Sequence, residues 1–160
     1  MSCNCRYYRD GVSDGQFQEV LSLEMESMKK ACKRIYGNNP PAQITFVVVQ
    51  KRHHTRFFPT DRKFSDGKNN NIKPGTVIDK DIVHPHQYQF FLASHAAIQG
   101  VTKPSKYCVL VNESKISPDD LQAITYDLCH LFTRCNRAVS YVAPTYYAHL
   151  VAARGKNYIM

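Results

Sequence analysis

The sequence predicts an α/β fold, and three observations indicate this class. The segment QITFVVVQ (43–50) is rich in β-branched residues and almost wholly apolar, which is typical of a strand buried on both faces of a sheet. Two stretches, at 16–36 and from 118 onward, carry apolar residues at helical spacing. Shorter strand-like runs lie between them, and this mixture of strands and helices is the pattern of a layered α/β domain. A length of 160 residues fits one domain.

The first long helix is predicted over 16–36. Its apolar residues return at steps near three, four and seven and therefore share one face: Phe17, Val20, Leu21, Met28, Cys32 and Ile35. Ser13 or Asp14 can cap its start, and Gly37 suits its end. Ahead of the helix, RYYR (6–9) can close a short strand before the turn sequence DGVSDG.

The middle of the chain is expected to contain a polar loop and three short strands. The loop covers 59–75, where Asp-Gly, Asn-rich and Pro-Gly sequences are typical of turns. The strands are predicted near 76–80, at 88–93 (YQFFLA) and at 107–111 (YCVLV).

The second long helix has the clearest start signal. Ser117 can cap it, and Pro118 suits the first helical position. The two acidic residues that follow favour the positive end of the helix dipole. Its apolar face is predicted to run through Leu121, Ile124, Leu128, Leu131 and Cys135. A last helix is predicted from about Pro144 and carries Tyr146, Tyr147, His149, Leu150 and Arg154.

The charge balance favours a polyanionic partner. Lys and Arg number 21 against 13 Asp and Glu, which gives a net charge of +8. Nucleic acid is the commonest partner of such a chain, and a merely basic soluble protein is the alternative. No run of about 18 apolar residues is present, and the first residues lack the apolar core of a secretory signal. We therefore expect no membrane partner and a cytoplasmic location.

The cysteines do not favour a metal cluster. Several of the six lie within apolar patterns, where a free thiol behaves as a small buried hydrophobe in a reducing compartment. Zinc ligands could be drawn from Cys129, His130 and Cys135, or from His84 and His86. No paired CxxC spacing is present, so we do not expect zinc.

Three places are candidates for chemistry. Asp10 ends a predicted strand beside a glycine turn, where it can either meet a ligand or cap the turn. His149 lies mid-helix in an apolar stretch, where a hydrogen-bonded core histidine is the alternative. Lys51-Arg52-His53-His54-Thr55-Arg56 follows a buried strand, and strand ends in open α/β sheets commonly bind ligands. The alternative for this basic cluster is a solvated loop.

Five ordered segments carry a family resemblance. They are YRDGVSDGQF, QITFVVVQKRHHTRFFP, HPHQYQFFLASHAAIQG, KPSKY and APTYYAHLVAARGK. Together they resemble the PIWI domain of eukaryotic Argonaute proteins, from about Tyr8 to Tyr158. The resemblance implies a ribonuclease H-like PIWI fold, with a mixed sheet flanked by helices. It also implies that 1–160 is a single partial PIWI domain, incomplete at the N-terminal side, which would expose a sheet edge.

The resemblance implies a guide-directed endoribonuclease that silences RNA and holds two Mg²⁺ ions with three acidic residues and a histidine. Asp10 of the RDG sequence and His149 of YYAHL match two of these ligands. The first aspartate and the glutamate lie upstream of RDG in the family and are absent here, so the chain alone is expected to be catalytically incomplete. The alternative is a guide-loaded RNA-binding module that does not cleave and acts through recruited partners.

The resemblance also implies a surface for a small guide RNA and its target RNA. The residues that match guide contacts are Lys51, Arg52, His95, Lys103, Arg134, Tyr146 and Arg154. Arg154 matches a contact to the guide 5′-phosphate, which a guanidinium can bind with two parallel hydrogen bonds. Lys103 stands where the family usually has arginine, and a lysine keeps the charge but cannot make this bidentate contact. Around a helix, His149 and Arg154 lie about 140° apart, so one helix can present them to different places. Tryptophan-motif silencing proteins are possible further partners.

Overall fold

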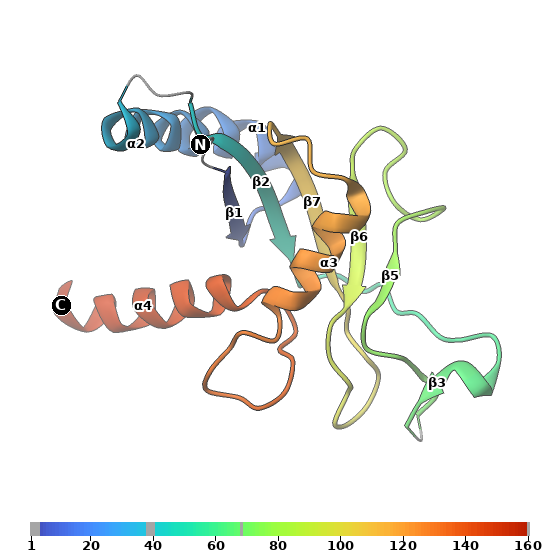
Figure 1. Ribbon diagram of the computed structural model, residues 1–160. Coiled ribbons are helices and arrows are strands. Elements are labelled where there is room, and N and C mark those ends of the chain that lie inside the picture. The colour runs from blue at the N-terminus through green and yellow to red at the C-terminus, as the bar shows by residue number, and fades with distance from the viewer. Residues whose placement is uncertain (1–3, 38–40, 68, 160) are drawn as a thin grey trace.

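The computed structural model describes residues 4–37, 41–67 and 69–159, and across these residues a five-stranded sheet forms the centre (Figure 1). The strand order is β1-β2-β7-β6-β5. β1 runs parallel to β2, whereas the other neighbours are antiparallel, so the sheet is mixed. The strands are β1 (Asn4–Asp10), β2 (Gln43–Gln50), β5 (Thr76–Ile78), β6 (Gln89–Ala93) and β7 (Ser105–Asn112).

The β2 strand has the predicted bounds and is buried on both faces. Because successive side chains point to opposite faces, β2 contributes to two separate cores. Phe46 and Val48 pack in one core, and Val47 and Val49 pack in the other. All four side chains have 0% exposure, which explains why the segment lacks the alternating pattern of a half-exposed strand.

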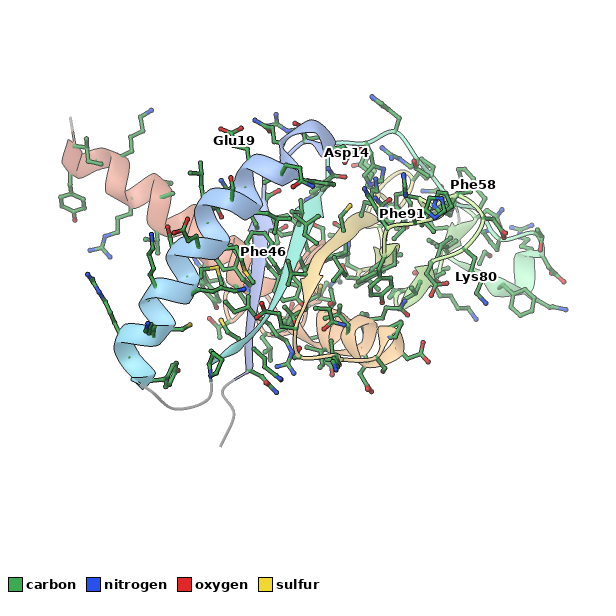
Figure 2. All side chains as sticks on the ribbon, turned by 90° about the horizontal axis from the view of Figure 1, so that it is seen from above. Asp14, Glu19, Phe46, Phe58, Lys80 and Phe91 are labelled. Atoms are coloured by element: carbon green, nitrogen blue, oxygen red, sulfur yellow. The ribbon has the colours of Figure 1, made fainter. Side chains whose placement is uncertain are left out.

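One face of the sheet is covered by the predicted 16–36 helix, which is interrupted. A short 3-10 turn (Asp14–Gln16) leads into α1 (Phe17–Val20), a π-turn (Leu21–Met25) and α2 (Glu26–Tyr36). Figure 2 shows these helices lying above the sheet, over Phe46. The apolar face is shorter than predicted: Phe17 is buried, but Ile35 is 74% exposed, because the end of α2 extends beyond the core cluster.

The opposite face is covered by α3 (Pro118–Leu128), whose Leu121 is fully buried against the second core. The Ser117 side chain accepts a hydrogen bond from the Asp120 N–H, as the capping signal predicted. The helix ends at Leu128, earlier than predicted. The last two residues of the predicted apolar face are exposed, Leu131 at 60% and Cys135 as well. The chain turns back at Cys129, whose carbonyl accepts from the N–H of Val139.

The last helix, α4 (Ala143–Ile159), starts one residue before the predicted proline. Figures 1 and 2 show that it projects away from the body of the molecule past the β1 side of the sheet. Only its start is buried, at Ala143 and Thr145, and Val151 is 71% exposed. His149 is exposed as well, so the alternative of a core histidine is wrong.

The predicted polar loop contains a small second element. Its structure is a 3-10 turn (Arg62–Phe64) followed by the paired strands β3 (Ser65–Asp66) and β4 (Asn71–Ile72). Tyr107 in β7 is buried and Tyr126 in α3 is half-buried. No helix in the part of the chain described by the structure is long and apolar enough to cross a bilayer.

Candidate functional site

An open cleft of about 940 Å³ lies at the carboxyl ends of β1 and β2, which meet at the same edge because the strands are parallel. Its walls include the turn after β1, the segment after β2, Tyr141 just before α4 and His149 within α4. The lining includes Asp10, Gly11, Lys51, Arg52, Tyr141 and His149. The cleft therefore joins the acidic, imidazole and basic candidates that the sequence places far apart.

Asp10 and His149 are in direct contact. The Nε2 atom of His149 lies 2.6 Å from Oδ2 of Asp10. The other carboxylate oxygen, Oδ1, accepts the N–H of Gly11 at 2.7 Å, so Asp10 also caps the turn. Gly11 has a φ of 76°, a left-handed conformation that glycine adopts readily. Asp10 can therefore cap the turn and still meet a ligand, because its side chain is 24% exposed and lines the cleft.

The backbone at Asp10 is held from the other face of β1. Arg9 donates from Nε to both carboxylate oxygens of Glu24, at 2.9 and 3.2 Å, and from Nη1 to the Asp10 carbonyl. Tyr7 donates to the same carboxylate at 3.1 Å. Glu24 lies in the π-turn, a local widening of a helix that often occurs near functional sites. The hydrogen bond to Glu24 raises the pKa of Arg9.

Lys51 faces the cleft beside the Asp10–His149 pair. Its Nζ donates to Oγ of Ser140 at 2.6 Å and lies 4.9 Å from the ring centroid of Tyr141. Arg52, the next residue, is exposed and lines the same cleft. Two cations of the basic cluster thus line the cleft that contains Asp10, an arrangement suited to binding a phosphate backbone.

The rest of the basic cluster builds the loop. His53 Nε2 bonds to the Pro104 carbonyl at 2.8 Å, and its Nδ1 is buried without a partner. Burial lowers the pKa of His53, so its imidazole is neutral near pH 7. Arg56 donates to the carbonyls of His53 and Thr55. Within this basic run, His53 is therefore uncharged and the guanidinium of Arg56 is engaged by backbone carbonyls, so fewer cations face solvent than the sequence suggests.

The other predicted contacts differ in their surroundings. His95 is half-buried with an unpartnered Nδ1, and burial together with Lys51 lowers its pKa. Tyr146 bonds through its hydroxyl to Ser140 Oγ at 2.8 Å. The remaining three are exposed and, within the described residues, do not line the cleft: Lys103, Arg134 and Arg154. Their roles stay predictions.

The donor set fits one side of a divalent-cation site. A carboxylate is the ligand that Mg²⁺ prefers, and imidazole is a common metal ligand. Within ranges 4–37, 41–67 and 69–159, no group of three or more His, Cys, Asp or Glu side chains gathers to hold a metal. Two donors are too few to hold a pair of ions, so Asp10 and His149 require further ligands.

Sequence reasoning missed Tyr141, Ser140 and Glu24, which contact the predicted residues. Tyr141 stacks on Tyr146 and meets His149 edge-on. Burial, followed by the nearby Tyr146 and Asp10, raises the pKa of Tyr141 to about 12. No motif or spacing pointed to these side chains, because their contacts join separate elements: Glu24 reaches Arg9 of β1, and Ser140 and Tyr141 reach Lys51.

The fold and the cleft define a class: a ribonuclease H-like α/β domain with a carboxylate–imidazole pair at a strand end, in a cleft that Lys51 and Arg52 also line. A family comparison agrees with this class. Residues 4–160 match the Piwi domain, and the chain belongs to this family, in its eukaryotic Argonaute branch.

Curated relatives are similar over most of this chain. Protein argonaute-2 of Drosophila melanogaster is 54% identical over 153 residues, which cover 96% of this chain and 12% of that protein. Protein argonaute 11 of rice (Oryza sativa subsp. japonica) is 52% identical over 156 residues, covering 96% of this chain and 17% of that protein. The chain therefore spans less than a fifth of the length of these relatives.

Solved structures support the fold. The C-terminal lobe of a budding yeast Argonaute matches with a TM-score of 0.86 and 33% identity, over 94% of this chain and 32% of that one. The Kluyveromyces polysporus Argonaute with a guide RNA matches with a TM-score of 0.85 and 33% identity, over 94% of this chain and 19% of that one. The predicted mixed sheet flanked by helices is confirmed.

Proposed function

We propose that this chain forms part of the guide-binding surface of an Argonaute and contributes half of a two-metal endoribonuclease site. The ligand is a small guide RNA paired to a target RNA, and the outcome is RNA-mediated silencing in the cytoplasm. The observation that carries the proposal is the 2.6 Å contact between Asp10 and His149 in a cleft that Lys51 also lines. The similar Kluyveromyces polysporus structure, which contains a guide RNA, supports the choice of ligand.

Asp10 and His149 would form one side of the metal site. Two Mg²⁺ ions, when bound, would supply an activated water and stabilise the leaving oxygen of the phosphodiester. The Gly11 N–H binds one carboxylate oxygen of Asp10, and the other oxygen contacts His149, which lines the same cleft. Arg9 and Glu24 fix the strand end from behind. By the family resemblance, the remaining carboxylates would come from the part of the parent protein that lies upstream of Asp10.

Lys51 and Arg52 would hold the sugar–phosphate backbone. Such contacts position a duplex without reading its sequence, so base pairing between guide and target would provide specificity. His95 would contribute as a hydrogen-bonding group and not as a charge, because its pKa is lowered. Lys103, Arg134, Tyr146 and Arg154 complete the proposed surface.

Cleavage by the full-length protein that carries this chain tests the catalytic half. With a loaded guide, a labelled target and Mg²⁺, Asp10→Asn and His149→Ala should each lower the cleavage rate by about a hundredfold or more. Guide affinity should stay unchanged. Asp119→Asn, an exposed acid at the start of α3, is the matched control. Wild-type cleavage rates in the Asp10→Asn protein would disprove the catalytic role.

A second function is a guide-loaded module that binds without cleaving and recruits partners such as tryptophan-motif silencing proteins. It would need only the RNA-holding part of the cleft, which Lys51 and Arg52 line, and not the metal ligands. A full-length protein that binds guide RNA in a Lys51-dependent manner, yet leaves a paired target intact in Mg²⁺, would establish this function instead.

A further inference from the structure

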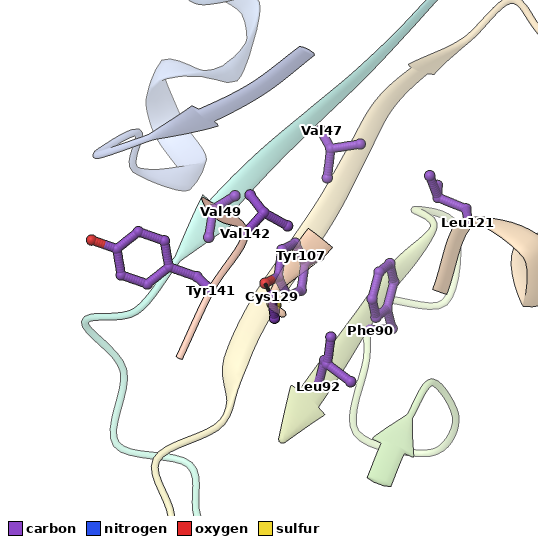
Figure 3. Packing of buried hydrophobic residues seen from close by; sticks show 9 residues of the cluster. All are labelled: Val47, Val49, Phe90, Leu92, Tyr107, Leu121, Cys129, Tyr141 and Val142. Atoms are coloured by element: carbon purple, nitrogen blue, oxygen red, sulfur yellow. Dashed lines mark hydrogen bonds between the residues drawn. The ribbon is translucent and has the colours of Figure 1, made fainter. Parts of the chain in front are cut away.

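Tyr141 lies between the basic and acidic parts of the cleft. Its ring belongs to the core cluster that contains Val49 and Val142, and the residue is only 8% exposed. Figure 3 shows the ring at the margin of this cluster, with the hydroxyl directed away from the other labelled side chains. The core therefore anchors one side of the ring, while the residue also lines the cleft.

On the helix side, Tyr141 contacts two residues of α4. Its ring is stacked on Tyr146, with centroids 4.0 Å apart and an interplanar angle of 7°. It meets the imidazole of His149 edge-on, at 6.3 Å and 76°. Positions three apart lie on the same side of a helix, so a single ring can contact both. Edge-on geometry is a preferred arrangement of aromatic pairs because of their ring quadrupoles.

On the strand side, Tyr141 contacts Lys51, one of the cations that line the cleft. The Nζ atom of Lys51 lies 4.9 Å from the ring centroid, within the range of a cation–π interaction. The preceding residue, Ser140, accepts a hydrogen bond from Lys51 and bonds to the Tyr146 hydroxyl. The carbonyl of Ser140 is itself fixed by Ser105 Oγ at 2.6 Å. The segment that carries Tyr141 is therefore held at several points.

We propose that Tyr141 is a positioning residue that fixes the Lys51 ammonium and the His149 imidazole relative to one another. This proposal rests on the proposed function, in which Lys51 binds a phosphate of the guide and His149 is a ligand of the metal site. The ring makes the stacking, edge-on and cation–π contacts, so Tyr141→Phe should retain the function. An aliphatic side chain fills the same core margin but has no ring quadrupole, so Tyr141→Leu should lose it.

Guide affinity tests the Lys51 contact without any catalysis. In the full-length protein, Tyr141→Leu should weaken binding of a single-stranded guide RNA by about two- to fivefold, the range of an exposed cation–π pair. In a Lys51→Met background the same substitution should have no further effect, because the cation is gone. An equal penalty in both backgrounds would overturn the proposal.

Single-turnover cleavage tests the His149 contact. Tyr141→Leu should lower the rate at saturating target by about two- to tenfold, with an unchanged target KM, and Tyr141→Phe should restore it. Tyr147→Leu, which loses a hydroxyl bonded to Thr133, is the matched control. A Tyr141→Phe protein as slow as Tyr141→Leu would contradict the proposal. If the wild type does not cleave, the proposed enzyme fails but the affinity cycle still decides the Lys51 contact.

A folding defect can be separated from lost positioning. Thermal unfolding should show Tyr141→Met, a flexible replacement of similar length, as folded and as weak in guide binding as Tyr141→Leu. A second measurement uses the wild-type side chain. When lysines are ¹³C-dimethylated, the NMR methyl signal of Lys51 should be shifted upfield, because its Nζ lies over the Tyr141 ring. The signal is assigned by its disappearance in the Lys51→Arg protein. An unshifted Lys51 signal would overturn the proposal even if no aliphatic variant folds.

Discussion

Removing the Lys51 ammonium should reduce the salt dependence of guide binding by a defined amount. Each phosphate contact to a single strand adds about 0.7 to the log–log slope of affinity against salt, and about 0.9 in a duplex. Of the predicted contact residues, His95 has a lowered pKa and adds no full charge near neutral pH. Lys51→Met should therefore change the slope by about 0.7 to 0.9, whereas His95→Gln should leave it nearly unchanged.

The assay is fluorescence anisotropy of a labelled guide with the full-length protein, at several salt concentrations from about 50 to 200 mM. Only differences between variants are compared, because other parts of the protein contribute to the absolute slope. Lys63→Met is the matched control, since its ammonium is paired with Asp61 at 3.1 Å on the distant β3 side. An unchanged slope for Lys51→Met, or an equal change for Lys63→Met, would refute a phosphate contact at Lys51.

Three further predictions concern stability. Phe46 has 0% exposure under α1 and α2, so Phe46→Ala should lower the free energy of unfolding by about 3–5 kcal/mol, measured by chemical denaturation. Glu24→Gln weakens the bonds from Arg9 and Tyr7 and should cost about 1 kcal/mol; an unchanged melting temperature would argue against their role. Burial lowers the pKa of His53, so the unfolded chain binds more protons below pH about 6.5. Stability should therefore fall as pH decreases through and below that value, and His53→Gln should flatten this part of a pH–stability curve.

The family resemblance predicted that Asp10 and His149 serve one site, and the structure brings them into contact across most of the chain length. Local patterns gave no distance between them. Their contact depends on the parallel pairing of β1 with β2 and on the direction of α4 past β1. Similarly, the sequence identified the basic cluster but not how its side chains differ: Lys51 is exposed in the cleft, whereas His53 is half-buried, packs against Phe91 and bonds to the Pro104 carbonyl.

Local patterns in the sequence determined the strand 43–50, the Ser117 cap and the start of α4, because backbone propensity, burial period and capping chemistry act over a few residues. They failed where long-range contacts decide: α3 stops at Leu128 although the apolar spacing continues, since residues 129–142 turn back over the sheet. Tertiary structure alone decided that Tyr141 reaches Lys51 and His149 together. Such contacts join side chains from separate elements, and no local spacing encodes where those elements meet.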